Sequence, residues 1–413
     1  MQLHFNSISE PSLPGVKWKK LFDTYWPAYS AWLNSKATAN TPDLKTSVAA
    51  LKYYMPEMIP TYQRLCKLVN ANDLAARFLT GYQPPAYISG CSQAVTLKST
   101  IQLVRNYDYH SDLIEGTLMM SAWNGKKVIA NSDCLSGVID GMNEDGLAVS
   151  LTFGGRKEVG TGFGIPFILR YVLEFCSNVE EAVTVLTRIP SHMSYNVTVI
   201  DKTGAIKTVQ MAPDKSPLVT DAMYTTNHQG NIDWPENALF NKTVERSDFL
   251  KDSLFDLDMN GEQIADAFLR PPLYSHRFTE GFGTLYTAVY QPVEGLVKLR
   301  WLNDNMIQSF DSFKEQDKLI KYQLNQTSAV HIPVQETVLV CQDSNQEVAY
   351  SSDSQEELAE TLINGMAQSA SLEGKERLKT LRKTLIHRGQ ISWEILADYW
   401  ANLGNEYWKK WQK

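Results

Sequence analysis

The junction Gly90–Cys91 places a nucleophile where a peptide bond can be strained, because glycine adopts backbone angles that other residues avoid. The Cys91 thiol could attack the carbonyl of Gly90, so that the amide becomes a thioester that water then cuts. Cys91 would become an N-terminus that carries both a thiol and an α-amino group. Such an amine titrates at about 7.7–8.0 and can act as a base near neutral pH. A Gly-Cys pair is also compatible with a buried structural cysteine.

Further motifs follow this junction in a fixed order. They are Gly90-Cys-Ser92, Arg105-Asn-Tyr-Asp108, Asp140-Gly-Met-Asn-Glu-Asp-Gly-Leu147, Thr226-Asn-His228 and Thr284-Leu285. In this order they resemble the penicillin acyltransferase family, which contains isopenicillin N acyltransferase and related β-alanyl-amine hydrolases. The chain is also similar to the choloylglycine hydrolases. The resemblance covers roughly residues 1–310 and does not extend to the last hundred.

The resemblance implies the N-terminal-nucleophile hydrolase fold, an α+β four-layer αββα sandwich in which two antiparallel sheets stack between helical layers. It also implies self-cleavage between Gly90 and Cys91. Residues 1–90 would then be a helical small subunit that stays associated with the rest. Residues 91–310 would form the catalytic core. Outside the resemblance, the sequence pattern of 311–413 predicts a mostly helical C-terminal extension packed on the core, with a strand pair over 330–341 and helices over 355–366, 375–387 and 392–411.

The resemblance further assigns roles to individual residues. Cys91 matches the nucleophile, and Asp108 matches the carboxylate that orients the freed α-amino group. Arg105 matches the basic residue beside the thiol, where its charge favours the thiolate and lowers the pKa of the amine. Asn227 matches an amide that helps form the oxyanion hole. Arg277, in Ser275-His-Arg-Phe278, is a looser match to a further arginine of the catalytic pocket.

Geometry puts one condition on these roles. Arg105 and Asp108 are three residues apart, so on a regular strand their side chains face opposite sides. We therefore expect a bend or bulge near Asn106-Tyr107 if both are to reach Cys91, and on a straight strand one of the two roles would be wrong. By themselves Arg105 and Asp108 could equally form a plain ion pair, and Asn227 could be a turn residue.

The function that follows is an amide hydrolase or N-acyltransferase that works through an acyl-thioester on Cys91. Its partner would be a small-molecule amide or acyl substrate. No cofactor is expected, although a coenzyme A thioester is a candidate co-substrate by the resemblance alone. Two alternatives remain: an uncleaved hydrolase that uses Cys91, His228 and Asn227, and a non-catalytic binding or assembly protein that retains the fold.

Hydrophobic patterns indicate the elements that would position these residues. Aromatic and apolar residues between Trp18 and Leu33 recur at three- and four-residue steps, which predicts a helix, and Pro27 could kink it. Short β-rich runs separated by turn signals follow from residue 91, and they favour antiparallel hairpins. Among the predicted strands are Leu147–Phe153, Tyr195–Asp201 and Ile206–Met211, and the turn signal Asp201-Lys-Thr-Gly204 lies between the last two. Residues 165–176 and 179–189 predict a helix pair between the strands. We expect the glycine-rich segment 154–164 to form a mobile loop over the pocket.

Composition narrows the classes of function. The 413 residues carry a net charge of −7 without a basic run, which argues against nucleic acid and anionic membranes as partners. The five cysteines form no C-x-x-C pair, and the histidines lack metal-ligand spacing, so we expect no metal. No signal segment or membrane-spanning stretch is visible, and we expect a soluble cytoplasmic protein. The oligomeric state is not indicated.

Overall fold

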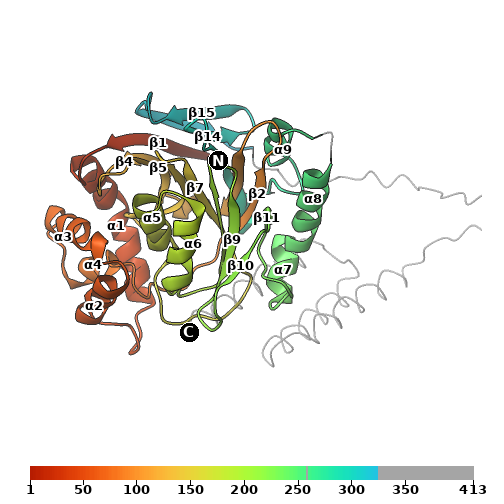
Figure 1. Cartoon of the computed structure of the whole chain (residues 1–413). Coiled ribbons are helices and arrows are strands. Elements are labelled where there is room, and N and C mark those ends of the chain that lie inside the picture. Colours follow the sequence, from red (N-terminus) through yellow and green to blue (C-terminus); the bar gives the residue numbers. More distant parts are fainter. Residues whose placement is uncertain (257–258, 324–413) are drawn as a thin grey trace, which may run out of the picture. The chain divides into compact units, whose positions relative to one another are not determined.

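The computed structural model of the chain describes residues 1–256 and 259–323. Within them two β-sheets lie face to face, and helices cover the outer face of each sheet (Figure 1). Strands β2 and β3 of one sheet contact β7 of the other, so the two sheets share an interior. The expected four-layer α+β arrangement is confirmed.

The larger sheet has the strand order β10-β9-β8-β7-β6-β5-β4-β1-β16 in the described residues. Its pairs are antiparallel except for β1 and β4, which are parallel. The strands are β1 (Gln2–Glu10), β4 (Thr117–Ser121), β5 (Val128–Asp133), β6 (Gly137–Asn143), β7 (Leu147–Phe153), β8 (Tyr195–Asp201), β9 (Ile206–Met211), β10 (Leu218–Thr220) and β16 (Gln316–Lys321).

The second sheet has the order β11-β2-β3-β13-β14-β15, and β12 pairs with β13 beside this path. Its strands are β2 (Gly90–Thr96), β3 (Gln102–Tyr109), β11 (Tyr224–Thr225), β12 (His276–Arg277), β13 (Phe282–Gln291), β14 (Leu296–Trp301) and β15 (Asp304–Ser309). Strand β2, which begins at the Gly-Cys junction, lies between β11 and β3 and is buried along its whole length.

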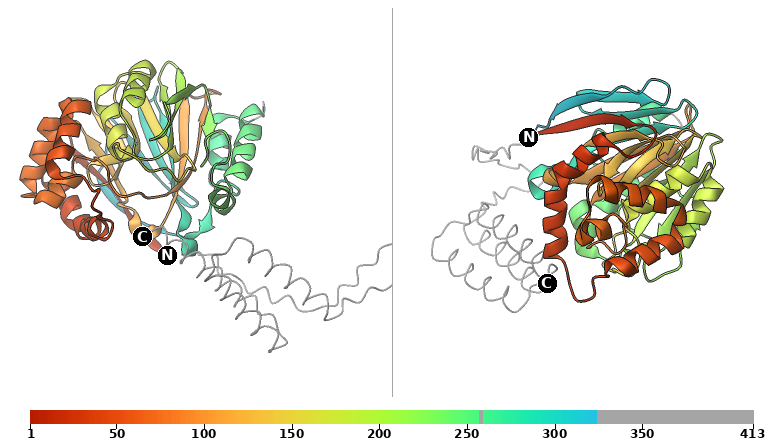
Figure 2. Two further views of the ribbon diagram at one scale, coloured as in Figure 1. Left: turned by 90° about the horizontal axis from the view of Figure 1, so that it is seen from below. Right: turned by 90° about the vertical axis from the view of Figure 1, so that its left-hand side faces the viewer.

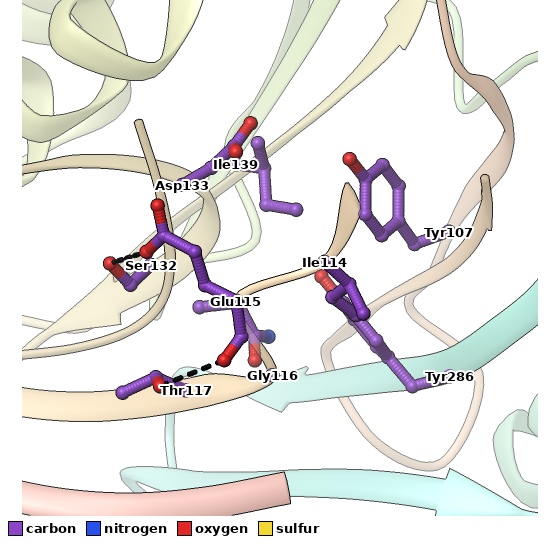
Figure 3. A pocket seen from close by; sticks show the side chains of 10 residues that line it. Tyr107, Ile114, Glu115, Gly116, Thr117, Ser132, Asp133, Ile139 and Tyr286 are labelled. Carbon is purple, nitrogen blue, oxygen red and sulfur yellow. Dashed lines mark hydrogen bonds between the residues drawn. The ribbon is translucent and has the colours of Figure 1, made fainter. Parts of the chain in front are cut away.

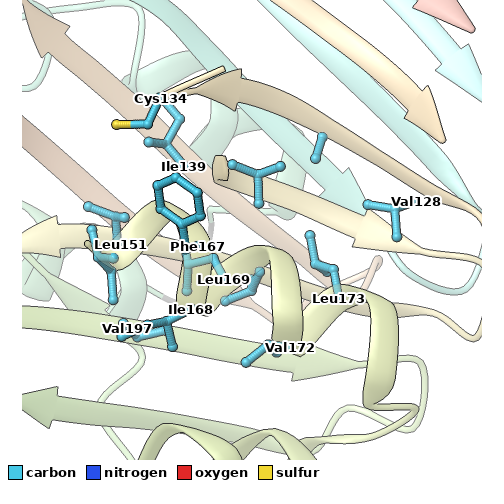
Figure 4. Close-up of a cluster of buried hydrophobic side chains, with 14 of the residues drawn as sticks. Val128, Cys134, Ile139, Leu151, Phe167, Ile168, Leu169, Val172, Leu173 and Val197 are labelled. Atoms are coloured by element: carbon cyan, nitrogen blue, oxygen red, sulfur yellow. The ribbon is translucent and has the colours of Figure 1, made fainter. Parts of the chain in front are cut away.

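Two helices cover the larger sheet. They are α5 (Ile165–Phe175) and α6 (Val179–Arg188), and they pack on β6 and β9 respectively. Helix α5 is apolar nearly all round, and its side chains fill the space above strands β5 to β8 (Figure 4). The Asn178 side chain caps α6 by accepting a hydrogen bond from the backbone of Glu181. The helix pair predicted from the sequence is confirmed.

Three helices cover the second sheet: α7 (Pro235–Asn241), α8 (Thr243–Phe255) and α9 (Gly261–Ala267). Leu250 of α8 and Ile264 of α9 pack with Ala94, Val104 and Val289, which come from the strands beneath. None of these helices was expected from the sequence. Helix α8 is mostly polar, so its hydrophobic pattern is weak.

The N-terminal ninety residues contain the expected helices and one unexpected strand. The helices are α1 (Val16–Ser35), α2 (Leu44–Tyr54), α3 (Ile59–Leu68) and α4 (Asp73–Phe78), and α1 continues through Pro27. Strand β1 lies between β4 and β16 in the larger sheet (Figure 2, right). This part of the chain is therefore not purely helical, and its strand completes a sheet of the core.

Short 3₁₀ helices occur at η1 (Pro56–Met58), η2 (Ser111–Leu113) and η3 (Phe278–Glu280). Beyond residue 310, strand β16 pairs with β1, so the larger sheet extends past the boundary expected for the core. The helices expected over 355–366, 375–387 and 392–411, and the strand pair expected over 330–341, lie outside the described residues.

A non-helical strap, residues 81–89, connects α4 to β2 and runs beside the glycine-rich segment 154–164. Gln83 donates its backbone N–H to Gly162, and Gly164 donates its own to Gly81. The glycine-rich segment therefore holds the strap that leads to Cys91. Its expected mobility stays a prediction.

Candidate active site

Strand β2 places Cys91 in the interior between the two sheets, where the residue is 0% exposed. Tyr107 of β3 lies directly across from it in register. The thiol sulfur lies 3.0 Å from Nη2 of Arg105, which donates to it, and 3.8 Å from the Ser89 hydroxyl. The sulfur therefore has a cationic donor on its interior side.

Several groups hold Arg105 in this position. Its Nε donates to the carbonyl oxygen of Leu151 on the opposite sheet at 2.8 Å, and its Nη1 forms an ion pair with Asp140. Tyr286 also donates to Asp140, at 2.9 Å. The Asp140 motif found in the sequence thus anchors the arginine that contacts the thiol, a role that the sequence did not assign.

Burial dominates the electrostatics of the thiol in the uncut chain. It raises the pKa of Cys91 above the usual value, whereas the Arg105 charge acts to lower it and Asp108 to raise it. The effect of Arg105 has the expected direction, but burial outweighs it. The thiol is therefore protonated in the uncut chain at neutral pH.

Asp108 lies on the other face of the sheet, directly across from Gly90. Thr284 donates to its carboxylate at 2.6 Å, and Arg246 lies 3.6 Å away. Burial raises the pKa of Asp108 although Arg246 and Thr284 lower it. The carboxylate thus lies beside the Gly90–Cys91 peptide, on the side opposite to the thiol.

The bend expected near Asn106-Tyr107 is wrong, because β3 pairs with β2 in unbroken register from residue 102 to 108. The irregularity lies in the neighbouring strand β13, between Thr284 and Tyr286. The expectation assumed that Arg105 and Asp108 must both approach the side chain of Cys91. The α-amino nitrogen belongs to the backbone, which a side chain on either face can approach.

Asn227 lies beside Cys91, just past the end of β11. Its Oδ1 accepts a hydrogen bond from the backbone N–H of Cys91 at 3.1 Å, and its Nδ2 donates to the carbonyl oxygen of Phe153 at 3.3 Å. The amide oxygen therefore faces the nitrogen of the Gly90–Cys91 peptide bond. The oxyanion-hole role needs the Nδ2 group instead, and it stays a prediction.

Gly155 shows why one position of the glycine-rich segment has to be a glycine. It has a φ of +69°, and a Cβ added to it would overlap the backbone carbonyl of Asn227. Because only glycine tolerates both the positive φ and the close approach, this residue fixes the backbone that carries Asn227.

Arg246 of α8 is a site residue that the sequence analysis missed. Its guanidinium donates to the Cys91 carbonyl oxygen at 2.6 Å, to the Ser92 hydroxyl at 2.8 Å and to Oδ1 of Asn227 at 2.6 Å. It also lies near Asp108. The side chain is buried, and this one arginine thus joins Asp108, Asn227 and the backbone of Cys91. Its only sequence signal was a charge within a stretch that was not recognised as a helix.

Arg277 lies apart from this group. Its guanidinium stacks 4.2 Å from the ring centre of Phe240 and donates to Glu280 at 3.0 Å. The ring of Phe282 lies between it and Gly90, since Phe282 faces both. Among the contacts of the described residues, none joins Arg277 to Cys91, so these contacts do not support a catalytic role.

His228 has no contact with the thiol among those of the described residues. Its Nδ1 bonds to the Thr243 hydroxyl at 2.8 Å, and burial and then Arg246 lower its pKa. The rival Cys/His arrangement is further disfavoured because Cys91 lies in a strand, whereas papain-like enzymes place the nucleophile at the start of a helix.

The described part of the chain holds no group of three or more His, Cys, Asp or Glu arranged to bind a metal ion. No helix within those residues combines the length and the apolar character needed to cross a membrane.

Two stacked sheets between helical layers, with Gly-Cys at the start of an inner strand, are the architecture expected of the N-terminal-nucleophile hydrolase fold. The chain belongs to the family described as acyl-coenzyme A:6-aminopenicillanic acid acyl-transferase, which matches residues 95–306, just over half of its length. The match includes Arg105, Asp108, Asn227 and Arg246 and begins after Cys91. The chain is therefore an enzyme of the hydrolase or N-acyltransferase type.

Similar solved structures include three with low identity. A conjugated bile acid hydrolase mutant from Clostridium perfringens is 15% identical, with 56% of this chain and 97% of that chain covered and a TM-score of 0.38. Penicillin V acylase from Agrobacterium tumefaciens is 14% identical, with 58% of this chain and 93% of that chain covered and a TM-score of 0.37. A Caenorhabditis elegans orthologue of N-acylethanolamine-hydrolyzing acid amidase is 16% identical, with 56% of this chain and 100% of that chain covered and a TM-score of 0.39. At these TM-scores the likenesses carry no argument. Among curated proteins, no sequence matches.

Proposed function

We propose that the chain cuts itself between Gly90 and Cys91, and that the freed Cys91 is the nucleophile of an enzyme that cleaves a linear amide through an acyl-thioester. One observation carries the proposal. The two groups that the chemistry needs flank the same peptide bond, with Arg105 on the thiol and Asp108 opposite Gly90.

In the self-cleavage step the thiol of Cys91 loses its proton and attacks the carbonyl carbon of Gly90. The carbon–nitrogen bond breaks, and the proton goes to the departing amine, which becomes the α-amino group of Cys91. Water then hydrolyses the thioester and leaves Gly90 with a free carboxylate. Asp108 stabilises the protonated amine that results.

In turnover the free α-amino group accepts the thiol proton as the thiolate attacks the substrate amide. The amine of the substrate takes that proton and leaves, and the acyl group stays on sulfur. Water or another acceptor then takes the acyl group. The substrate is a small-molecule amide or acyl compound, and a coenzyme A thioester is a candidate donor that the described residues do not identify.

The test is the intact mass of the purified protein under denaturing conditions. Wild-type protein should give two species, residues 1–90 and 91–413, and Cys91→Ala should give one. Cys134→Ala is the matched control, because Cys134 is also a buried free cysteine and should not affect cleavage. A wild-type chain that stays whole through long incubation would refute self-cleavage.

A further inference from the structure

The interior between the two sheets contains a small cavity next to Tyr107, between the ends of β3 and β5 (Figure 3). It has room for about one water molecule, and neither Cys91 nor Asn227 is among the residues that line it. This cavity therefore offers no site beside the nucleophile. A buried side chain that does bear on Cys91, and that the mechanism above leaves out, lies next to the loop that carries Asn227.

The Asn227 loop, residues 226–234, is not part of a strand or a helix. Strand β11 ends at Thr225, and α7 begins at Pro235. Thr226 and Asn227 are each 1% exposed, so the start of the loop is buried. Because a buried carbonyl needs a donor, and regular strand pairing does not supply one here, the start of the loop depends on side chains for its hydrogen bonds.

Asn196 of β8 supplies donors on both sides of Asn227. Its side chain is buried, and its Nδ2 donates to the carbonyl oxygen of Thr226 at 3.1 Å and to that of His228 at 3.0 Å. Nδ2 also lies 3.0 Å from the hydroxyl of Thr152, which itself donates to the Thr226 carbonyl at 2.8 Å. Among the described residues, Asn196 alone donates to the carbonyl of His228. One amide thus ties the residues before and after Asn227 to the larger sheet.

The other end of this amide has no partner. Oδ1 of Asn196 is buried and forms no hydrogen bond with any described residue. Turning the amide round would place that oxygen against the carbonyls of Thr226 and His228, which are acceptors themselves. A buried polar atom without a partner costs stability, so its presence in a folded protein calls for a reason. The two hydrogen bonds that Nδ2 donates to the loop are such a reason.

The position of the loop matters because Asn227 contacts the backbone of Cys91. Its Oδ1 accepts hydrogen bonds from the Cys91 N–H at 3.1 Å and from Arg246 at 2.6 Å. Its carbonyl lies against Gly155, where a Cβ would overlap it. Arg246 therefore holds the side chain, Gly155 leaves room for the carbonyl, and Asn196 fixes the two neighbouring carbonyls.

We propose that Asn196 is a positioning residue, which fixes the loop on both sides of Asn227 and so holds the Asn227 amide against the nitrogen of the Gly90–Cys91 peptide bond. The proposal rests on the proposed function, in which this bond is cut. During the cut the nitrogen of Cys91 takes up a proton and departs as an amine, and an acceptor at hydrogen-bond distance stabilises it. A misplacement of about 1 Å can cost about 10²-fold in rate, so a loop that shifts would slow the cut.

The test follows the cut by intact mass in Asn196→Ala, at a temperature well below the Tm of the variant. We expect the rate to fall by at least about 10-fold, because Asn227 is then free to shift. Asn143→Ala is the matched control. Asn143 is equally buried, and its Nδ2 also donates to two backbone carbonyls, those of Leu173 at 2.9 Å and Cys176 at 2.7 Å. The control should lower the Tm without slowing the cut.

A second substitution and a double variant separate positioning from stability. Asn196→Leu keeps the branched shape and removes the unpaired oxygen together with the two donors, so it should slow the cut as Asn196→Ala does. In the Asn227→Ala background the amide to be positioned is absent, so adding Asn196→Ala should change the remaining rate by less than about 2-fold. Wild-type rates in both Asn196 variants, equal slowing by Asn143→Ala, or undiminished slowing in the Asn227→Ala background would overturn the positioning role.

Hydrogen exchange gives a measurement that does not depend on the cut. It uses Cys91→Ala, which should stay whole and keeps the backbone N–H of residue 91. Adding Asn196→Ala should speed exchange in peptic peptides that cover residues 226–229, as read by mass spectrometry, and adding Asn143→Ala should not. Unchanged exchange would overturn the proposal. If exchange rises but wild-type protein never cuts itself, the proposed function fails, whereas the hold of Asn196 on the loop stands.

Discussion

Arg246 offers the sharpest test of how the site is held together. Its guanidinium donates to three buried acceptors: the carbonyl of Cys91, the hydroxyl of Ser92 and the amide oxygen of Asn227. A lysine at this position keeps the charge but can satisfy only part of this set. Each buried acceptor left without a donor costs about 1–3 kcal/mol, so losing two should destabilise the fold by about 2–6 kcal/mol.

The effect on self-cleavage should exceed the effect on stability. Asn227 would lose the donor that fixes its amide, and Asp108 would lose the guanidinium beside it. Losing an oxyanion-hole donor typically costs about 10²–10³ in rate. Because the substitution would leave Asn227 in place but less well oriented, we expect Arg246→Lys to slow the cut at Gly90–Cys91 by at least about 10-fold.

The assay follows the uncut fraction over time by intact mass, at a temperature well below the Tm of each variant. Arg170→Lys is the matched control. Arg170 is equally buried and bonds to Glu174, Ser121 and the Ser136 carbonyl, far from the thiol's partners. It should lower the Tm without slowing the cut. Equal cleavage rates for Arg246→Lys and wild type, or equal slowing by the control, would refute the positioning role.

The other predictions address single features of the site. Asp108→Asn keeps the shape of the side chain but removes the charge that stabilises the freed amine, so intact-mass time courses should show much slower cleavage with little change in Tm; an unchanged rate would remove Asp108 from the mechanism. Gly155→Ala should impair turnover through Asn227, whereas Gly230→Ala, which has a similar positive φ and open space around it, should cost only backbone strain; equal activities would contradict the clash. Burial lowers the pKa of His192 from 6.5 to about 4, so the unfolded state binds more protons between these values. Stability should therefore fall by about 3 kcal/mol between pH 7 and pH 4, and urea titrations of His192→Gln should lack this component.

Local patterns sufficed for much of the fold. Strands Leu147–Phe153, Tyr195–Asp201 and Ile206–Met211 are confirmed at the predicted residues. Each is a short β-rich run, and two of them meet at the turn signal Asp201-Lys-Thr-Gly204. The β-forming residues and the turn residues therefore predict the same hairpin. Helix α5 was equally clear because its long apolar run ends at the cap of the next helix.

Features that depend on distant segments were not predictable in this way. Strand β1 pairs with β16, more than three hundred residues away, and a nine-residue strand of mixed polarity carries no signal of such a partner. The same holds for Arg246, which comes from a polar helix and reaches Cys91 only after the chain has folded back by about 155 positions. Motif order did find Asn227, which is 136 positions from Cys91, because it lies in the motif Thr226-Asn-His228, whereas Arg246 lies in none of the motifs.

The position of Cys91 at the start of a central strand explains why its two helpers need not share a face. A strand presents side chains alternately above and below, but its backbone nitrogen lies in the plane between them. In the proposed mechanism the thiol therefore works in the interior beside Arg105, while Asp108 would orient the nitrogen of the same residue from the helical side. The three-residue spacing of Arg105 and Asp108 fits this mechanism, since a two-residue spacing would place both side chains on one face. A cysteine that acts through its own backbone amine can therefore use partners on both sides of its strand.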